Sequence, residues 1–67
     1  MITLRINGDP REVPEGLTLA TLLPHLGLDP RMVVVEHNRV IVRKTGLAAV
    51  PVVAGDEIEI VHFVGGG

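Results

Sequence analysis

The first seven residues alternate between apolar and polar side chains, with isoleucine, leucine and isoleucine at positions 2, 4 and 6. This period of two predicts a strand with one buried and one solvated face. The segment Asn7–Pro10 (NGDP) is a strong turn signal. Arg11–Val13 then returns as far as Pro14. We therefore expect an antiparallel hairpin at the start of the chain.

The period changes to that of a helix between residues 15 and 30. Thr18 can cap the helix through its hydroxyl group, and Gly27 suits the left-handed residue that ends one. Pro24 lies beyond the first turn, where it removes a backbone hydrogen bond and should bend or shorten the helix. The spacing i, i+3, i+4 and i+7 places four side chains on one face. They are Leu19, Leu22, Leu23 and Leu26.

A second hairpin is predicted in the valine-rich middle of the chain. Met32–Glu36 is nearly all apolar, which is typical of a strand covered on both faces. His37–Arg39 is the expected turn, and Val40–Val42 is the expected return strand.

The last third of the chain is irregular until its final strand. One helical turn is expected near Gly46–Ala49, and Gly55–Asp56 marks a tight turn. Glu57–Phe63 is the final strand, with three side chains on one face: Ile58, Ile60 and His62. The predicted order of elements, in short form, is β-β-α-β-β.

Composition restricts the function. The chain has 67 residues, 11 valines and a single aromatic side chain, Phe63, so we expect one small domain with an aliphatic core. A net charge of −2, with Lys44 as the sole lysine and no basic stripe, argues against nucleic-acid binding. Cysteine is absent, and nothing resembles a leader or a membrane-spanning run. The expected compartment is the cytoplasm.

Few side chains suggest chemistry, and we expect no catalytic residue. The three histidines, at positions 25, 37 and 62, match no metal-ligand spacing. Asp56 is explained as a turn residue, and Glu57 and Glu59 share a solvated strand face. Asn38 is likewise interpreted as a turn residue, and Arg43 and Lys44 as surface charges. No phosphate-binding loop occurs, so the chain itself should bind no nucleotide or other cofactor.

The chain resembles the ThiS family of sulfur carriers of thiamine biosynthesis along nearly its whole length. The resemblance rests on Asn38 with Val40 and Arg43, on the Gly55–Asp56 turn before an alternating strand, and on the terminal glycines. It implies an α+β fold, the ubiquitin-like β-grasp, in which the first and last strands pair in parallel at the sheet centre and one helix crosses one face. The domain would span residues 1–63, and residues 64–67 would form a flexible tail.

The resemblance also implies where the chemistry occurs. A ThiF-like adenylating enzyme would use ATP to activate the carboxylate of Gly67. A sulfur donor, such as a cysteine desulfurase system, would convert it to a thiocarboxylate for a ThiG-like thiazole synthase. An α-carboxyl group is ionised at neutral pH, and glycine makes a slim tail. Val64, Gly65 and Gly66 would thread into the partner, and His62 and Phe63 would contribute to docking.

Two other functions fit the same sequence. A molybdopterin-pathway carrier, of the MoaD type, uses similar chemistry, although those relatives tend to be longer. A ubiquitin-like binding or tagging module would form an amide through its tail or would not react. Pro24 and Leu47 depart from the usual family pattern, in which a polar residue and an aromatic residue are common. Both departures concern packing and leave the expected role of the tail unchanged.

Overall fold

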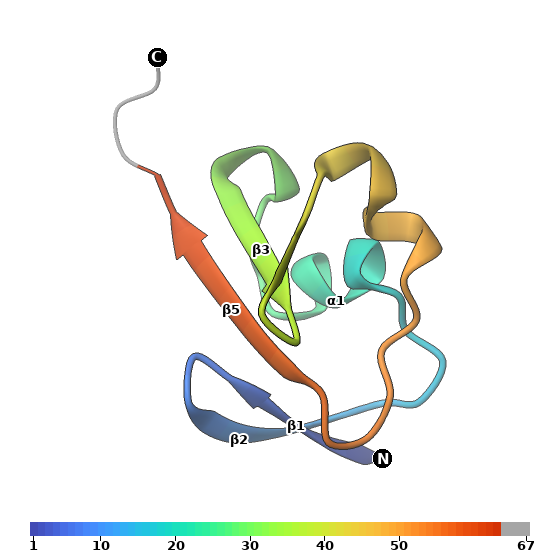
Figure 1. Cartoon of the computed structure of the whole chain (residues 1–67). Helices are drawn as coiled ribbons and strands as arrows, with labels where there is room; N and C mark the ends of the chain where they lie inside the picture. Colours follow the sequence, from blue (N-terminus) through green and yellow to red (C-terminus); the bar gives the residue numbers. More distant parts are fainter. Residues whose placement is uncertain (64–67) are drawn as a thin grey trace.

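The computed structural model describes residues 1–63, and the expectations for residues 64–67 lie outside this range. Within it, the chain forms one α-helix, two short 3-10 helices and five strands (Figure 1). In chain order they are β1 (Ile2–Ile6), β2 (Asp9–Val13), α1 (Leu19–His25), η1 (Pro30–Met32), β3 (Val33–His37), β4 (Val40–Val42), η2 (Lys44–Ala49) and β5 (Glu57–His62). The observed order is β-β-α-β-β-β. The predicted order β-β-α-β-β has one strand fewer after the helix, where the second hairpin contributes two strands and β5 contributes a third.

The strands form one mixed sheet in the order β2-β1-β5-β3-β4. The central pair, β1 and β5, is parallel, with Arg5 opposite Glu57 and Ile6 opposite Ile58. The remaining pairs are antiparallel. The first and last strands thus lie side by side within the sheet, as the resemblance implied, with β2 on one side of the pair and the β3–β4 hairpin on the other (Figure 1).

The core lies between the sheet and the helices α1 and η2. Its buried members are Leu4, Ile6, Val13, Leu19, Leu22, Leu23, Val33, Val35, Leu47, Val52, Ile58 and Ile60. Thr18 caps α1, and its side chain accepts a hydrogen bond from the Thr21 backbone. The helix ends at His25, directly after Pro24, and Gly27 follows with a φ of 79°. The expected cap, early end and left-handed stop are therefore confirmed.

The prediction that the strand Met32–Glu36 is covered on both faces was wrong. Val33 and Val35 are buried, but Val34 is 41% exposed. The reason is that α1 and η2 pack on one face of the sheet only, so every second residue of β3 faces outward. This outer face is what the fold leaves available for a partner.

Both hairpins turn through residues with positive φ. These are Asn7 and Gly8 (51° and 87°) and Asn38 and Arg39 (50° and 72°). Two consecutive residues in this region form the type I′ turn, whose twist matches that of the flanking strands. The second turn thus occupies part of the predicted range His37–Arg39, while His37 itself completes β3.

Candidate functional site

The end of β5 is the root from which the C-terminal segment leaves the domain. The backbone N–H of Phe63 donates a hydrogen bond to the carbonyl of Met32 at 3.1 Å. The Phe63 ring, 40% exposed, lies 5.4 Å from the Lys44 ammonium group. His62 is exposed, although its position in the strand alternation is that of Ile58 and Ile60.

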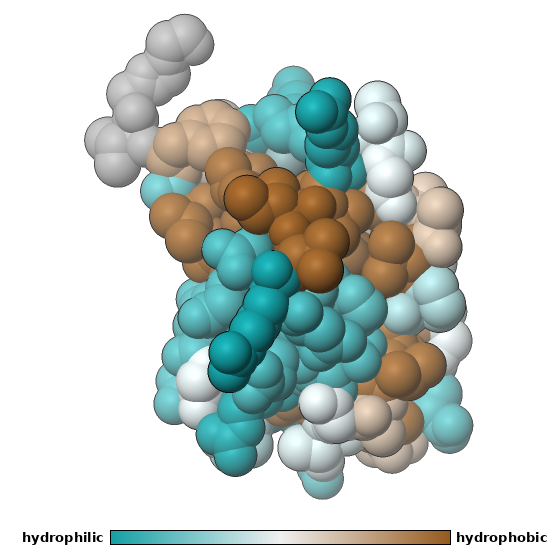
Figure 2. All heavy atoms as spheres, viewed as in Figure 1, coloured by the Kyte–Doolittle hydropathy of each residue, from teal (hydrophilic) through white to brown (hydrophobic). Residues whose placement is uncertain are grey.

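An apolar patch adjoins this root on the outer face of the sheet. Val34 and Val61 are directly opposite each other in the β3–β5 pair, and they are 41% and 60% exposed. Ile41 of β4, 65% exposed, borders the same surface groove as Val34 and Phe63. We call Val34, Ile41, Val61 and Phe63 the outer patch. Figure 2 shows apolar atoms gathered on this side of the molecule. Exposed apolar surface of this kind often marks an interaction site.

The other half of the outer face is polar. Glu57 and Glu59 are exposed, as expected, and Glu36 lies opposite Glu59 in the β3–β5 pair. Arg39 approaches Glu57 to 4.0 Å at the surface, and Arg5 is the parallel neighbour of Glu57. Exposed ion pairs of this kind contribute little to stability. Their mixed charges instead give the face a polar border, which can orient a docking partner.

Among residues 1–63, Asp56 is the one polar residue that is buried, and it is only 6% exposed. Its Oδ2 accepts hydrogen bonds from the Val53 N–H at 3.0 Å and from His37 Nε2 at 2.9 Å, and its Oδ1 accepts one from Asn38 Nδ2 at 3.2 Å. Burial raises the pKa of this carboxyl group, but these three donors outweigh burial and hold the pKa below 3.8. A carboxylate can only accept hydrogen bonds, so His37 Nε2 is the donor in its hydrogen bond with Asp56.

Asn38 joins this network to the start of β5. Its side-chain Oδ1 accepts from the Glu57 N–H at 2.9 Å, and its own N–H donates to the Glu57 carbonyl at 2.7 Å. The turns that Asp56 and Asn38 were expected to form are thus present and tied together. Among the described residues, no buried side-chain nitrogen or oxygen atom of the network lacks a hydrogen-bond partner. We therefore assign the network a structural role: it fixes the start of β5.

The other candidates do not converge on a site. His25 and His62 are exposed, and His37 is half-buried. Among residues 1–63, no three His, Asp or Glu side chains are grouped so that they could hold a metal ion. No helix in this part of the chain is long and apolar enough to span a membrane. Val64, Gly65, Gly66 and Gly67 lie outside the described residues.

The sequence interpretation missed the specific contacts of Lys44. Its ammonium group donates to the Arg31 carbonyl at 3.0 Å besides facing the Phe63 ring. Nothing in a local pattern indicates that residues 31, 44 and 63 meet. A faint signal was available: these positions include the sole lysine and the sole aromatic side chain of the chain.

The chain is similar in sequence to known proteins. Residues 4–67 match the model of the ThiS family. The sulfur carrier protein ThiS of Bacillus subtilis is 40% identical over 65 residues, which cover 96% of this chain and 98% of that protein. Thiazole synthases of Magnetococcus marinus and Paramagnetospirillum magneticum are 42% and 48% identical over 64 residues. The match covers 96% of this chain but only 20% of either synthase.

The fold also matches a solved structure. The crystal structure of a thiamine biosynthesis protein (ThiS) from Geobacter metallireducens superposes with a TM-score of 0.85 at 33% identity. The superposition covers 98% of this chain and 100% of the other. The arrangement of one helix on a five-stranded mixed sheet is thus that of a solved ThiS protein.

Proposed function

Because the chain belongs to the ThiS family, we propose that it carries sulfur for the thiazole moiety of thiamine and is not itself a catalyst. The group that is modified is the C-terminal carboxylate of Gly67. The domain presents this end to enzymes that act on it. The single observation that supports this most directly is the outer patch beside Phe63, an apolar docking surface at the root of the C-terminal segment.

The proposed reaction has three steps. In a ThiF-like adenylating enzyme, an oxygen of the Gly67 carboxylate attacks the α-phosphate of ATP, and pyrophosphate leaves. In the second step, the terminal sulfur of a persulfide, supplied by a donor such as a cysteine desulfurase system, attacks the acyl carbon and displaces AMP, and a thiol then cleaves the resulting acyl disulfide, which releases the thiocarboxylate and leaves a disulfide on the donor. Thiazole synthase then takes up the sulfur, and the carboxylate is regenerated. The need for ATP makes the cytoplasm the proposed compartment.

We propose that two parts of the chain bind the partner in different ways: the folded domain docks on its surface, and the C-terminal segment enters its active site. The outer patch, together with His62, binds the partner surface, while Val64, Gly65 and Gly66 pass into its active site. Four extended residues beyond Phe63 reach about 13–14 Å. Fixing such a segment costs about 1–2 kcal/mol for each residue, so the affinity comes mainly from the folded domain.

Thiazole synthase is the proposed recipient. Two relatives that carry this name contain a segment similar to almost all of this chain within a protein about five times longer. A carrier-like segment within the same polypeptide as a synthase supports a direct encounter between the two.

The test is intact mass and C-terminal peptide analysis after incubation with a ThiF-type enzyme, ATP and a sulfur donor. Replacement of one oxygen by sulfur on the C-terminal peptide is the expected result. A matched variant with one alanine added after Gly67 should stay unmodified and should not restore growth of a thiamine auxotroph that lacks its carrier. Conjugates to other proteins would instead indicate tagging, and sulfur transfer to a molybdopterin synthase only would indicate the other pathway.

A further inference from the structure

Three elements that are distant in sequence meet at the root of the C-terminal segment. They are η1, η2 and the end of β5. Two adjacent carbonyl groups of η1 take part: that of Arg31 accepts from Lys44 Nζ at 3.0 Å, and that of Met32 accepts from the Phe63 N–H at 3.1 Å. Lys44 and Phe63 thus bind to neighbouring points of one short helix, and the ammonium group also faces the Phe63 ring at 5.4 Å.

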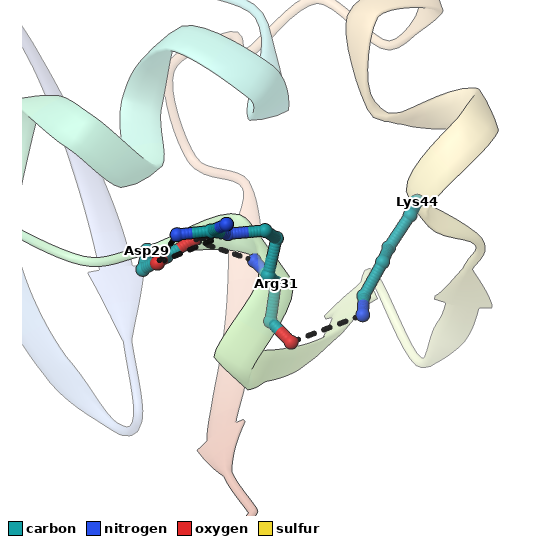
Figure 3. Close-up of polar contacts among 3 residues, drawn as sticks. All are labelled: Asp29, Arg31 and Lys44. Atoms are coloured by element: carbon teal, nitrogen blue, oxygen red, sulfur yellow. Dashed lines mark hydrogen bonds and ion pairs between the residues drawn. The ribbon is translucent and has the colours of Figure 1, made fainter. Parts of the chain in front are cut away.

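Each of the two helices that meet at this contact has a further contact of its own. Asp29 caps η1 and accepts hydrogen bonds from the Arg31 backbone and guanidinium group at 2.9 Å each (Figure 3). The bonds from Arg31 lower the pKa of Asp29 to about 2, so the carboxylate stays ionised and the pair is present at neutral pH. On the other side, Lys44 begins η2, which is anchored in the core by the buried Leu47. Figure 3 shows Lys44 extending from η2 toward the Arg31 carbonyl.

We propose that Lys44 is a positioning residue that fixes the direction in which the C-terminal segment leaves the domain. The inference rests on the proposed function, in which that segment must enter a partner enzyme. Phe63 is the last residue before the segment and its ring is partly exposed. Besides the cation over its ring, the hydrogen bond from its backbone N–H to the Met32 carbonyl holds Phe63 among the described residues, and the ring keeps its freedom if the cation is removed. Lys44 removes this freedom before docking, so less entropy is lost in the complex.

The chemistry of a lysine suits this role. Its ammonium group has three donors and no acceptor, so one donor serves the Arg31 carbonyl while the charge still faces the aromatic ring. A cation within about 6 Å of a ring centroid is attracted by the negative face of the ring. Arg43, the adjacent residue, is exposed and borders the same groove. It supplies a charge-matched comparison.

The test uses Lys44→Met, which keeps the length and the apolar stem but removes the charge and the donors. In the free protein, ¹⁵N relaxation and amide exchange should show greater motion of Phe63, with the melting temperature nearly unchanged. In adenylation by a ThiF-type enzyme, KM should rise about two- to fivefold while kcat is retained, because the bound segment is held by the partner. Lys44→Arg should restore most of both properties.

The controls separate this inference from the proposed function. Arg43→Met removes the same charge from the neighbouring position and should leave the motion of Phe63 as in the wild type. If Arg43→Met increases the motion of Phe63 as much as Lys44→Met does, or if Lys44→Met changes neither Phe63 motion nor KM, the positioning role is wrong. If the wild-type protein is not adenylated at all, the proposed function fails, whereas the relaxation experiment still decides whether Lys44 orders Phe63.

Discussion

The side chain of Asn7 pairs with the backbone of Ile60 as though it were a strand residue. Its Nδ2 donates to the Ile60 carbonyl at 3.1 Å, and its Oδ1 accepts from the Ile60 N–H at 2.7 Å. The backbone N–H of Asn7 also donates to the Ile58 carbonyl. One residue therefore turns the first hairpin and extends the pairing of β1 with β5 beyond the end of β1.

We expect Asn7→Asp to lower the free energy of unfolding by about 1–3 kcal/mol, because the carboxylate cannot donate to the Ile60 carbonyl and leaves a partly buried group unpaired. Urea denaturation would measure this loss. Asn7→Gly accommodates the positive φ but makes neither side-chain bond, so it should also be less stable than the wild type. Wild-type stability of Asn7→Gly would show that the turn, and not the pairing, is what matters.

The network around Asp56 predicts a specific pH dependence. Because the pKa of Asp56 is lower in the folded protein than 3.8, the ionised carboxylate stabilises the fold above pH 3.8, and this stability is lost as the pH falls below that value. Asp56→Asn should lower the free energy of unfolding by about 1–3 kcal/mol at pH 7. Its difference from the wild type should shrink on acidification.

Asp29→Asn is the matched comparison for that experiment. The pKa of Asp29 is also lowered, to about 2, but its ion pair with Arg31 lies at the surface. Removing a surface ion pair has little effect on stability. An equal loss in both variants at pH 7 would contradict the special role of the buried network.

Arg39 occupies a position that favours glycine. Its φ of 72° places an ordinary side chain in the left-handed region, and its ion pair with Glu57 is long and exposed. We expect Arg39→Gly to raise the free energy of unfolding by about 0.5–1 kcal/mol. Arg39→Ala loses the same ion pair but keeps the strained conformation, so it should bring no gain in thermal denaturation.

The outer patch can be tested without disturbing the core. Val61→Thr and Val34→Thr retain β-branched side chains on exposed positions, so stability should change by less than about 0.5 kcal/mol. Both should reduce kcat/KM for adenylation, mainly through a higher KM, because apolar contact with the partner is lost. Val53→Thr, which is 55% exposed and is not a member of the outer patch, should leave adenylation unchanged. Unchanged kinetics for both patch variants would place docking elsewhere.

The local features of this protein were determined by the sequence. The alternation in residues 1–7, the leucine face after Thr18 and the turns at Asn7, Asn38 and Gly55 each act through neighbours along the chain, so local physics sufficed to predict them. The same is true of the early helix end at His25, where Pro24 removes one helical hydrogen bond and Gly27 supplies the left-handed residue that ends a helix. The resemblance to the ThiS family added the parallel pairing of β1 and β5, which periodicity does not contain.

Only the tertiary structure decided which apolar residues are buried and which long-range contacts form. An apolar run such as that of β3 has the same pattern whether helices cover one face of a sheet or both, and Val34 is exposed because α1 and η2 lie together on one face. The meeting of His37 with Asp56, and of Lys44 with Arg31 and Phe63, joins residues 13 to 19 positions apart. Such contacts depend on how the elements pack, and no local pattern encodes them.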